Sequence, residues 1–156
     1  MDSWIHFNSY VAEGEIHYLN FDLEIYLIND VGEEKEQVGI GKLYSFNGNI
    51  YNNSKILINA SSVSNDTSGA LRSVRIFKTK SDYEEQENYS SDHIVNVYGY
   101  LGVLEELIIV PEYRDKGIGT RTINEIINYC KAAGINFLLF KTTSLRRGWF
   151  VGEGRM

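Results

Sequence analysis

Large apolar residues alternate with polar ones in the first clearly patterned segment, FDLEIYLIN at residues 21–29. Every second residue from Phe21 to Leu27 is apolar, and the acidic residues Asp22 and Glu24 stand between them. A period of two predicts a strand with one buried face, because successive side chains of a strand point to opposite faces of its sheet.

A second strand is predicted soon after the first. The sequence NDVG at 29–32 is typical of a turn, and QVGIGKLYSF at 37–46 again has strand character, so the two strands should pair antiparallel. Gly39 and Gly41 indicate a bulge in the second strand. Further on, the segment 55–59 predicts either a short strand or the edge of a lid.

The middle of the chain predicts one helix and one acidic loop. Polar residues at 64–68 are good helix N-caps, and the apolar positions after them have helical spacing, so a helix is expected at about 67–78. The segment 82–92 is rich in acidic side chains and has no basic one. This composition favours a solvated loop, with an acidic rim that attracts a substrate as the alternative.

A long β-rich stretch, HIVNVYGYLGVLEELIIV, occupies residues 93–110. Gly99 and Gly102 indicate a bend or a tight hairpin within it. Its second half, 103–110, has almost no polar alternation, which is typical of a central strand buried on both faces. Pro111, the one proline of the chain, marks the end of this strand.

The strongest helix signal follows at 120–133. Isoleucines recur on one face of this segment, and Gly134 follows as a C-cap. The segment INFLLFK at 135–141 is then a buried strand. The order strand, helix, strand predicts a right-handed crossover between two parallel strands. The residues from Thr142 onward predict no element.

The composition is that of one folded domain. The 156 residues are 43% hydrophobic and 23% charged, so the chain can bury a substantial core, and we expect a single domain over 1–156. The chain has 15 Lys and Arg against 21 Asp and Glu, which gives a net charge of -6. This balance argues against attraction of the whole surface to nucleic acid or to an anionic membrane, while a local basic patch stays open.

Cysteine and histidine usage predicts neither disulfides nor a metal site. Cys130 is the only cysteine, and the three histidines are scattered without metal-ligand spacing. No run of apolar residues is long enough to predict a membrane helix, and the start MDSWIHFNSY lacks the features of a signal peptide. We therefore expect a cytoplasmic protein, with Cys130 as inert packing in its helix.

The segment most informative about chemistry is LIIVPEYRDKGIGTRT at 107–122. A buried strand ends there, and a short turn with Gly117 and Gly119 opens the long helix. Glycines let a ligand approach the backbone, and the first N–H groups of a helix have no partner within it. Together with the positive end of the helix dipole, these groups make an anion site, to which Arg114 and Lys116 add positive charge.

Two other phosphate-binding motifs do not fit this segment. The P-loop string GxxxxGK[ST] is absent, and the Rossmann pattern GxGxxG fails because Thr122 stands where its third glycine should be. What remains is R-x-x-G-x-G at 114–119. In its strand–turn–helix–strand context it resembles the acyl-CoA-binding motif of the GNAT acetyltransferase superfamily. The resemblance covers residues 103–141 and implies an α/β (α+β) fold, a GNAT-like mixed central β-sheet flanked by helices, here with a shortened C-terminal end.

The resemblance also implies roles for residues of this segment. The strand would bind the pantetheine arm of acetyl-CoA through its backbone, in a slot opened where it splays from the strand at 135–141. An unpaired N–H near Ile109 would polarise the thioester carbonyl, and Arg114 would start the motif and shape the turn. The implied cofactor-binding residues are Leu107, Ile108 and Ile109 on the strand, Arg114 at the start of the motif, and Asp115, Lys116, Gly117, Ile118, Gly119 and Thr120 around the pyrophosphate.

The implied activity is direct acetyl transfer from acetyl-CoA to an amine. An alkyl amine is mostly protonated at neutral pH, so a general base is required. Glu105 and Glu106 stand on the motif strand just before the cofactor stretch and are the candidate catalytic residues. Because adjacent strand residues point to opposite faces, only one should face the site, and we favour Glu105. The alternative is that both carboxylates are solvated or ion-paired.

The C-terminal part departs from the family pattern. Many GNAT enzymes carry a helix with an Asn and a Tyr after the fifth strand, the Tyr serving as general acid, whereas residues 141–147 offer neither. Tyr98 and Tyr100 are the alternative proton donors, and residues 142–144 are candidates to line the cofactor arm. Two questions stay open: whether a second subunit, as in a homodimer, completes the sheet, and whether the chain is instead a catalytically inactive GNAT-like module that binds CoA or a protein partner.

Overall fold

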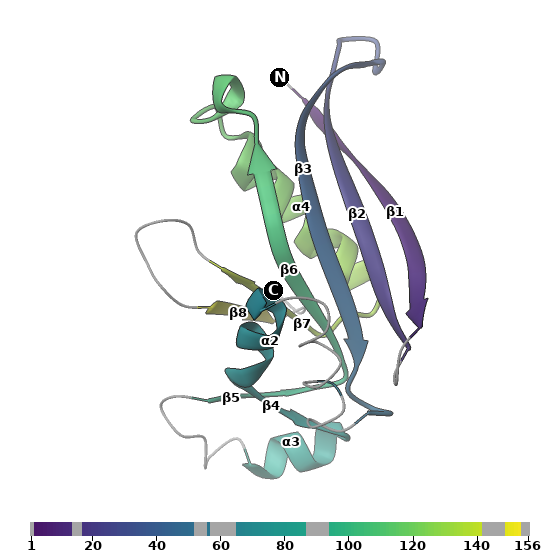
Figure 1. Ribbon diagram of the computed structural model, residues 1–156, viewed down its shortest axis with the longest axis vertical. Coiled ribbons are helices and arrows are strands. Elements are labelled where there is room, and N and C mark those ends of the chain that lie inside the picture. Colours follow the sequence, from purple (N-terminus) through teal and green to yellow (C-terminus); the bar gives the residue numbers. More distant parts are fainter. Residues whose placement is uncertain are drawn as a thin grey trace.

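The computed structural model describes residues 2–13, 17–51, 56, 65–86, 94–141 and 149–153. Within these residues the main sheet has six strands in the order β1-β2-β3-β6-β7-β8, and neighbours run antiparallel except for the parallel pair β6 and β7 (Figure 1). A separate parallel pair is formed by β4 and β5. The strands of the main sheet are β1 Ser3–Glu13, β2 His17–Ile28, β3 Glu34–Asn47, β6 Tyr100–Ile109, β7 Phe137–Lys141 and β8 Trp149–Glu153. The remaining elements are β4 Val74–Phe77, β5 Val95–Tyr98, α2 Asn65–Arg72, α3 Lys80–Gln86 and α4 Ile118–Ala132.

The N-terminal half of the sheet confirms the predicted hairpin. The strands predicted at 21–29 and 37–46 lie within β2 and β3, which pair antiparallel. The bulge expected at the glycines of β3 is also present, since the register with β2 shifts by one residue beside Gly39. A Cβ atom at Gly39 would lie only 2.8 Å from the carbonyl oxygen of Ile108, so this glycine lets β3 pack closely against β6. β1, for which the sequence predicts no element, pairs with β2 along its whole length.

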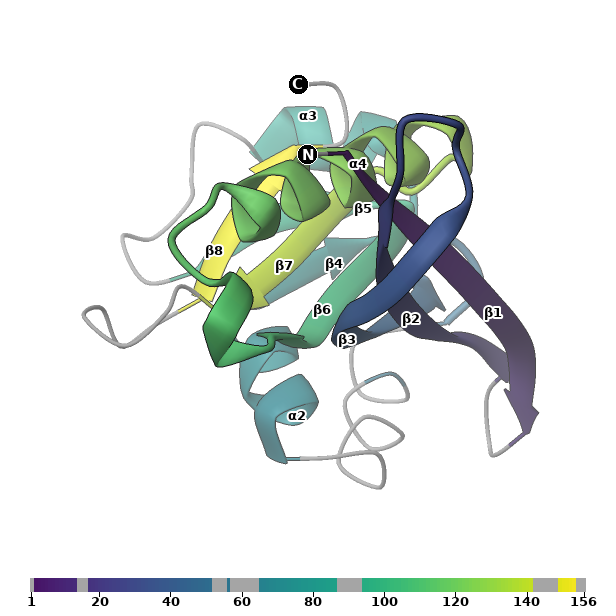
Figure 2. The same ribbon diagram turned by 90° about the horizontal axis from the view of Figure 1, so that it is seen from above.

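The main sheet buries both of its faces in the region around β6. One face packs against α4, and its core includes Leu43, Leu104, Ile126 and Cys130. The other face packs against α2, β4 and β5, and there Tyr44 and Val103 of the main sheet are buried. Figure 2 shows α4 and α2 on opposite sides of β6 and β7. The predicted helix at 120–133 is α4, which begins two residues earlier, and the predicted parallel pairing of its flanking strands is confirmed.

The helix predicted at 67–78 is wrong in its second half. α2 ends at Arg72, and Val74–Phe77 forms strand β4. Both the backbone N–H and the hydroxyl of Ser73 donate hydrogen bonds to the carbonyl oxygen of Ala70, which closes the helix. Buried and less buried residues alternate along β4, as expected of a strand. The same apolar residues also have helical spacing, so the sequence pattern fits both structures.

The acidic segment is also different from the predicted loop. Its first part belongs to α3, whose side chains are not buried, so only the prediction of solvent exposure is confirmed there. Residues 87–92 lie outside the described residues, and so does the segment 55–59 apart from Ile56, which is buried in the core beside α2.

Gly99 forms the joint between β5 and β6. Its φ of 76° is left-handed, so the chain bends there as predicted, but the two strands do not form a hairpin, because β5 pairs with β4 and β6 pairs with β3 and β7. The side chain of Asn136 closes over the joint: its Oδ1 accepts a hydrogen bond of 3.0 Å from the Tyr100 N–H. A Cβ atom at Gly99 would lie 2.1 Å from that oxygen.

We expect Gly99→Ala to destabilise the fold more than Gly134→Ala. Both glycines have a left-handed φ, but a Cβ atom at Gly134 would have no neighbour within 4 Å. The backbone cost is roughly 1–2 kcal/mol at either position, and Gly99→Ala also disrupts the hydrogen bond of Asn136, which adds about 1 kcal/mol. Urea unfolding of the two variants measures the difference; equal losses of unfolding free energy would mean that Asn136 does not constrain the joint.

Candidate functional site

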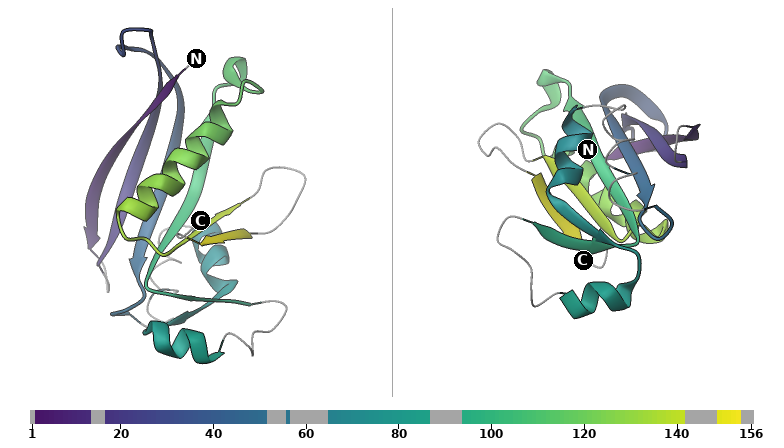
Figure 3. Two further views of the ribbon diagram at one scale, coloured as in Figure 1. Left: turned by 180° about the vertical axis from the view of Figure 1, so that it is seen from behind. Right: turned by 60° about the horizontal axis from the view of Figure 1, so that its bottom comes forward.

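β6 separates from β7 halfway along its length. β7 pairs with β6 only opposite Leu101–Leu104, and beyond that point no strand in the described part of the chain covers this edge of β6. The view from behind shows β6 continuing past β7 toward the turn before α4 (Figure 3). Beyond Leu104 the side chains of β6 are also no longer buried, and Ile108 is 43% exposed. The prediction that the strand at 103–110 is buried on both faces is therefore wrong beyond Leu104. The splay that the family resemblance implies is present.

The uncovered edge of β6 carries backbone groups that point into this gap. The N–H of Val110 donates to the carbonyl oxygen of Val38 in β3 at 2.8 Å, so the neighbouring residue Ile109 directs its N–H and C=O to the other edge. The carbonyl oxygen of Ile109 accepts a hydrogen bond of 2.8 Å from Nε of Arg114, in agreement with this direction. By the same alternation, Leu107 also presents its backbone to the gap. The edge is thus open to pairing by an extended ligand.

The turn between β6 and α4 presents the start of the helix to solvent. After the 3-10 turn Pro111–Tyr113, Asp115 and Gly117 both have a left-handed φ, of 60° and 79°. Gly117 is the N-cap of α4, and no side chain caps the helix there in the part of the molecule described. Ile118 is buried and anchors the first turn of the helix, whereas residues 114–117 are exposed.

The two motif glycines differ from the glycines that the fold itself needs. A Cβ atom at Gly117 would meet no described atom within 4 Å, and one at Gly119 would meet only Cγ1 of Ile109, at 3.9 Å. Packing within the protein therefore does not require a glycine at Gly119, in contrast to Gly39. The open space lies beside N–H groups at the positive end of α4, which is the arrangement that binds phosphate groups at helix N-termini.

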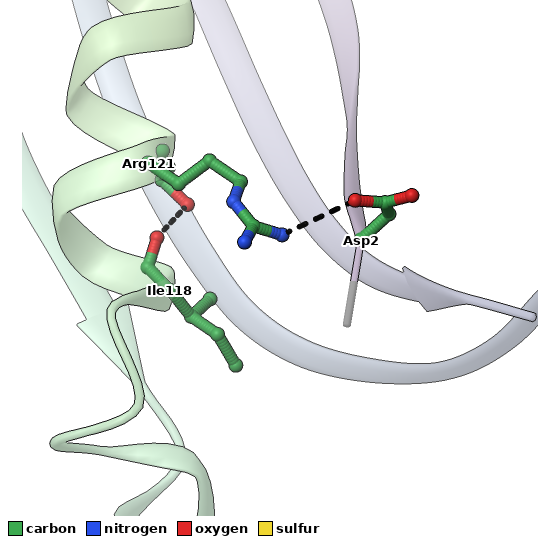
Figure 4. A network of polar contacts seen from close by, with 4 residues as sticks. Asp2, Ile118 and Arg121 are labelled. Carbon is green, nitrogen blue, oxygen red and sulfur yellow. Dashed lines mark hydrogen bonds and ion pairs between the residues drawn. The ribbon is translucent and has the colours of Figure 1, made fainter.

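Side chains of the turn also hold it against the sheet. The hydroxyl of Tyr113 donates a hydrogen bond to Oε2 of Glu36 in β3, and this bond raises the pKa of Tyr113. Nζ of Lys116 lies 5.5 Å from the centre of the Tyr113 ring, which keeps its positive charge beside the turn. Figure 4 shows a contact one turn further along, where Nη1 of Arg121 lies 3.7 Å from Oδ1 of Asp2. Exposed pairs of this kind contribute little to stability, about 0–1 kcal/mol.

Glu105 and Glu106 lie on the same face of the sheet, and the prediction that only one of them faces the site is wrong. In the register of β6 with β3, Leu104 lies opposite Leu43 and Glu106 opposite Lys42, so Glu105 is the extra residue of a bulge. Leu104 and Leu107 both pack on the α4 side, so the two residues between them do not alternate. The bulge brings both carboxylates to the face opposite α4, at the level where β7 leaves β6.

Tyr44 is a residue of this site that the sequence analysis did not identify. It lies on β3 opposite Val103, is 4% exposed, and faces the same side of the sheet as Glu105. Burial, followed by the nearby negative charge of Glu105, raises the pKa of Tyr44. The strand pattern at 37–46 gives the face of Tyr44, but its neighbour on β6 depends on the bulge.

The tyrosines considered as alternative proton donors are not brought to the glutamates. Tyr100 lies at the start of β6, five residues before Glu105, which is roughly 16 Å along an extended strand. Its hydroxyl accepts a hydrogen bond of 3.1 Å from Nδ2 of Asn47. Tyr98 packs edge-on against Phe137 in the core, with ring centres 5.3 Å apart. Residues 142–144 lie outside the described residues.

Cys130 is buried, as the sequence predicts for a packing residue. It lies on the core-facing side of α4 and is 1% exposed, and this burial raises the pKa of its thiol to about 12. The thiolate is the reactive form, so the native protein should resist iodoacetamide at neutral pH and should react only after unfolding by denaturant. Because the chain has one cysteine, intact-protein mass spectrometry reports this directly. Rapid alkylation of the native protein would contradict the burial of Cys130.

Comparison with known families agrees with the motif and the fold. Residues 82–147 match the family described as Acetyltransferase (GNAT) family, a segment that contains β5, β6, α4 and β7. The match confirms the resemblance to the GNAT superfamily, and the mixed sheet with α4 and α2 on opposite faces is consistent with that fold. It also supports acyl transfer from acetyl-CoA as the general activity. No curated protein and no solved structure matched the chain significantly. None of the helices that the structure describes is long and apolar enough to cross a membrane.

Proposed function

We propose that this protein transfers the acetyl group of acetyl-CoA directly to a primary amine. The observation that carries the proposal is the uncapped N-terminus of α4, with open space at Gly117 and Gly119, next to the free edge of β6. The N–H groups at 115–120 would bind the pyrophosphate, and the backbone of Leu107–Ile109 would bind the pantetheine arm. Arg114 contributes by tying the turn to the end of β6 through Ile109.

The residues present fit the chemistry of the transfer. Acetyl-CoA supplies an activated thioester when it is bound. Glu105 and Glu106, at the level where the gap between β6 and β7 opens, would remove the proton of the incoming ammonium group, because an alkyl amine with a pKa of about 10.4 is otherwise unreactive at neutral pH. The N–H groups on the free edge of β6 would donate hydrogen bonds to the carbonyl oxygen as negative charge develops on it.

Two measurements test this proposal. Thermal unfolding is followed with CoA and with pantetheine, which lacks the pyrophosphate; only CoA should raise the melting temperature substantially. Release of free thiol from acetyl-CoA is then followed with n-butylamine, 1,4-diaminobutane and a lysine-containing peptide. Thiol release that depends on an amine supports the proposal. Stabilisation by CoA without thiol release would instead support the inactive module, and an equal response to CoA and pantetheine would exclude the pyrophosphate site.

The proposal also covers the cell compartment of the reaction, the extent of the domain and the oligomeric state. An enzyme that uses cytoplasmic acetyl-CoA fits the location expected from the sequence, and one domain over 1–156 would contain both the cofactor site and the amine site. Whether two copies associate is measured by light scattering of the purified protein.

A further inference from the structure

Two isoleucines lie opposite each other on the solvent side of the sheet. Ile40 of β3 pairs with Ile108 of β6, and the exposed fractions of these two residues are 45% and 43%. The next residue of β6, Ile109, packs on the α4 side, so Ile108 points to the other face. A Cβ atom at Gly39 would also lie on the α4 side, against the side chain of Ile109, so Ile40 points away from α4 as well. In Figure 1 this face is turned toward the viewer, with α4 behind the strands. The chain thus exposes an isoleucine pair where alternation in a sheet with one buried face would place polar residues.

The isoleucine pair adjoins the two carboxylates of β6. Glu106 lies on the same face as Ile108 and two residues before it, so the two side chains are neighbours along the strand. The diagonal from Glu106 to Ile40 spans roughly 7–8 Å. On the other side of Ile108, the backbone of Ile109 faces the gap between β6 and β7. The proposed base, the gap and an exposed apolar surface therefore meet on one short stretch of β6.

The charged residues around the isoleucine pair have neighbours of opposite charge or a hydrogen-bond donor. Lys42 lies opposite Glu106 on β6 and opposite Asp22 on β2. Glu24 lies on β2 beside the pair, and its Oε2 accepts a hydrogen bond of 2.9 Å from the hydroxyl of Tyr26. Because Lys42 stands next to the pair on β3, a second positive charge on the acceptor would be repelled there, and an uncharged carbon body fits better.

We propose that the acceptor is a primary amine with an apolar carbon body, which lies across the isoleucine pair while its ammonium group meets the carboxylates of Glu105 and Glu106. This inference rests on the proposed function. The negative carboxylates complement the ammonium group, and the exposed apolar surface beside them complements the carbon chain. Carbon–carbon bonds of about 1.5 Å at tetrahedral angles let an extended chain of about six carbons cover the diagonal from Glu106 to Ile40.

The first test detects binding and requires no activity. The protein is labelled with ¹³C at the isoleucine δ1 methyl groups, and the signals are assigned with single substitutions of isoleucine by valine. n-Hexylamine, added in the presence of CoA, should shift the signals of Ile40 and Ile108. Ile50, which is exposed in the turn after β3, is the internal control and should not shift. Unchanged signals of the pair, or equal shifts at Ile50, would overturn the inference.

The second test measures kcat/KM for n-alkylamines from ethylamine to n-hexylamine, whose pKa values are nearly the same, so that only the chain length varies. Full burial of a methylene group is worth about fourfold in affinity, and a chain covered on one side only should gain half of that free energy, or about twofold per methylene group. The value for n-hexylamine should therefore exceed that for ethylamine about 16-fold.

Ile40→Thr tests whether the isoleucine pair is the source of this gain. Threonine keeps a β-branched side chain, which suits a strand, but replaces apolar surface by a hydroxyl group. The variant should retain the wild-type rate with ethylamine, and the gain for n-hexylamine should fall to about fourfold. Val95→Thr is the matched control, since Val95 is 46% exposed and lies on β5 in the separate pair of strands. It should keep the full gain.

The outcomes separate this inference from the function on which it rests. A gain with chain length that Ile40→Thr reduces and Val95→Thr keeps supports the apolar acceptor. The same kcat/KM for every chain length would overturn it and leave the proposed function in place. So would a kcat/KM for 1,6-diaminohexane more than twofold above that for n-hexylamine, because the carboxylates of Asp22 and Glu24 would then select the acceptor. A protein that releases no thiol with any amine would contradict the proposed function, whatever the methyl signals show.

Discussion

Gly117→Glu should abolish the stabilisation of the protein by CoA. No side chain of the described residues caps the N–H groups at the start of α4, and a Cβ atom at Gly117 would meet no described atom within 4 Å, so the glutamate would place both atoms and a negative charge in front of them. A ligand at a hundred times its Kd stabilises the folded state by about 2.7 kcal/mol, and this entire contribution should disappear. Thermal unfolding with and without CoA measures it.

Gly117→Gln is the matched control, because the backbone problem is the same in both variants. The φ of Gly117 is 79°, which costs an L-residue roughly 1–2 kcal/mol whatever its charge. Both variants should therefore unfold at similar temperatures without ligand, and the glutamine variant should keep part of its response to CoA. A full response to CoA in Gly117→Glu would remove the pyrophosphate site from this turn.

The turn between β6 and α4 was predictable because it depends on residues that are close in the sequence. Pro111 ends a strand, two glycines follow, and an apolar period of a helix begins, so local rules place the helix N-terminus within two residues. The hydrogen bond from Arg114 to Ile109 is local as well, since five residues separate the two. The link between Tyr113 and Glu36 spans 77 residues and had no signal in the sequence.

The arrangement of the two glutamates was not predictable, because it depends on residues that are far apart in the sequence. Alternation along one strand places Glu105 and Glu106 on opposite faces, and only the pairing of β6 with β3 introduces the bulge that brings them together. Local rules alone therefore cannot identify which carboxylates share a site. Tyr44 enters the site through the same pairing, more than 50 residues away in the sequence.

Errors in the fold arise where the apolar pattern fits two periods or neither. The apolar positions from Ala70 to Phe77 fit a helix, yet the last four residues form β4, which pairs with β5 and buries Val74 and Ile76. β1 lies at the edge of the sheet, and its adjacent residues Tyr10 and Val11 are both exposed. Apolar residues at neighbouring positions hide the alternation by which a strand is recognised in the sequence.

Glu105→Gln should lower kcat on the order of 100-fold, the smaller end of what a general base contributes, and should leave the CoA response unchanged. Gln keeps the size of the side chain, so the loss would report the missing basic oxygen. Glu106→Gln is the matched variant on the same face, with Lys42 as its cross-strand neighbour. We expect a smaller loss from it, because Lys42 lies opposite Glu106 and its positive charge competes with the incoming ammonium group for that carboxylate.

Thiol release from acetyl-CoA with a saturating amine measures kcat for both variants and for the double variant. If the two carboxylates act on one proton, the double variant should lose little more than Glu105→Gln, since the effects of groups that act together are not additive. A larger loss in Glu106→Gln than in Glu105→Gln would exchange the roles of the two residues. Wild-type rates in all three variants would place the base outside β6 and end the assignment of both.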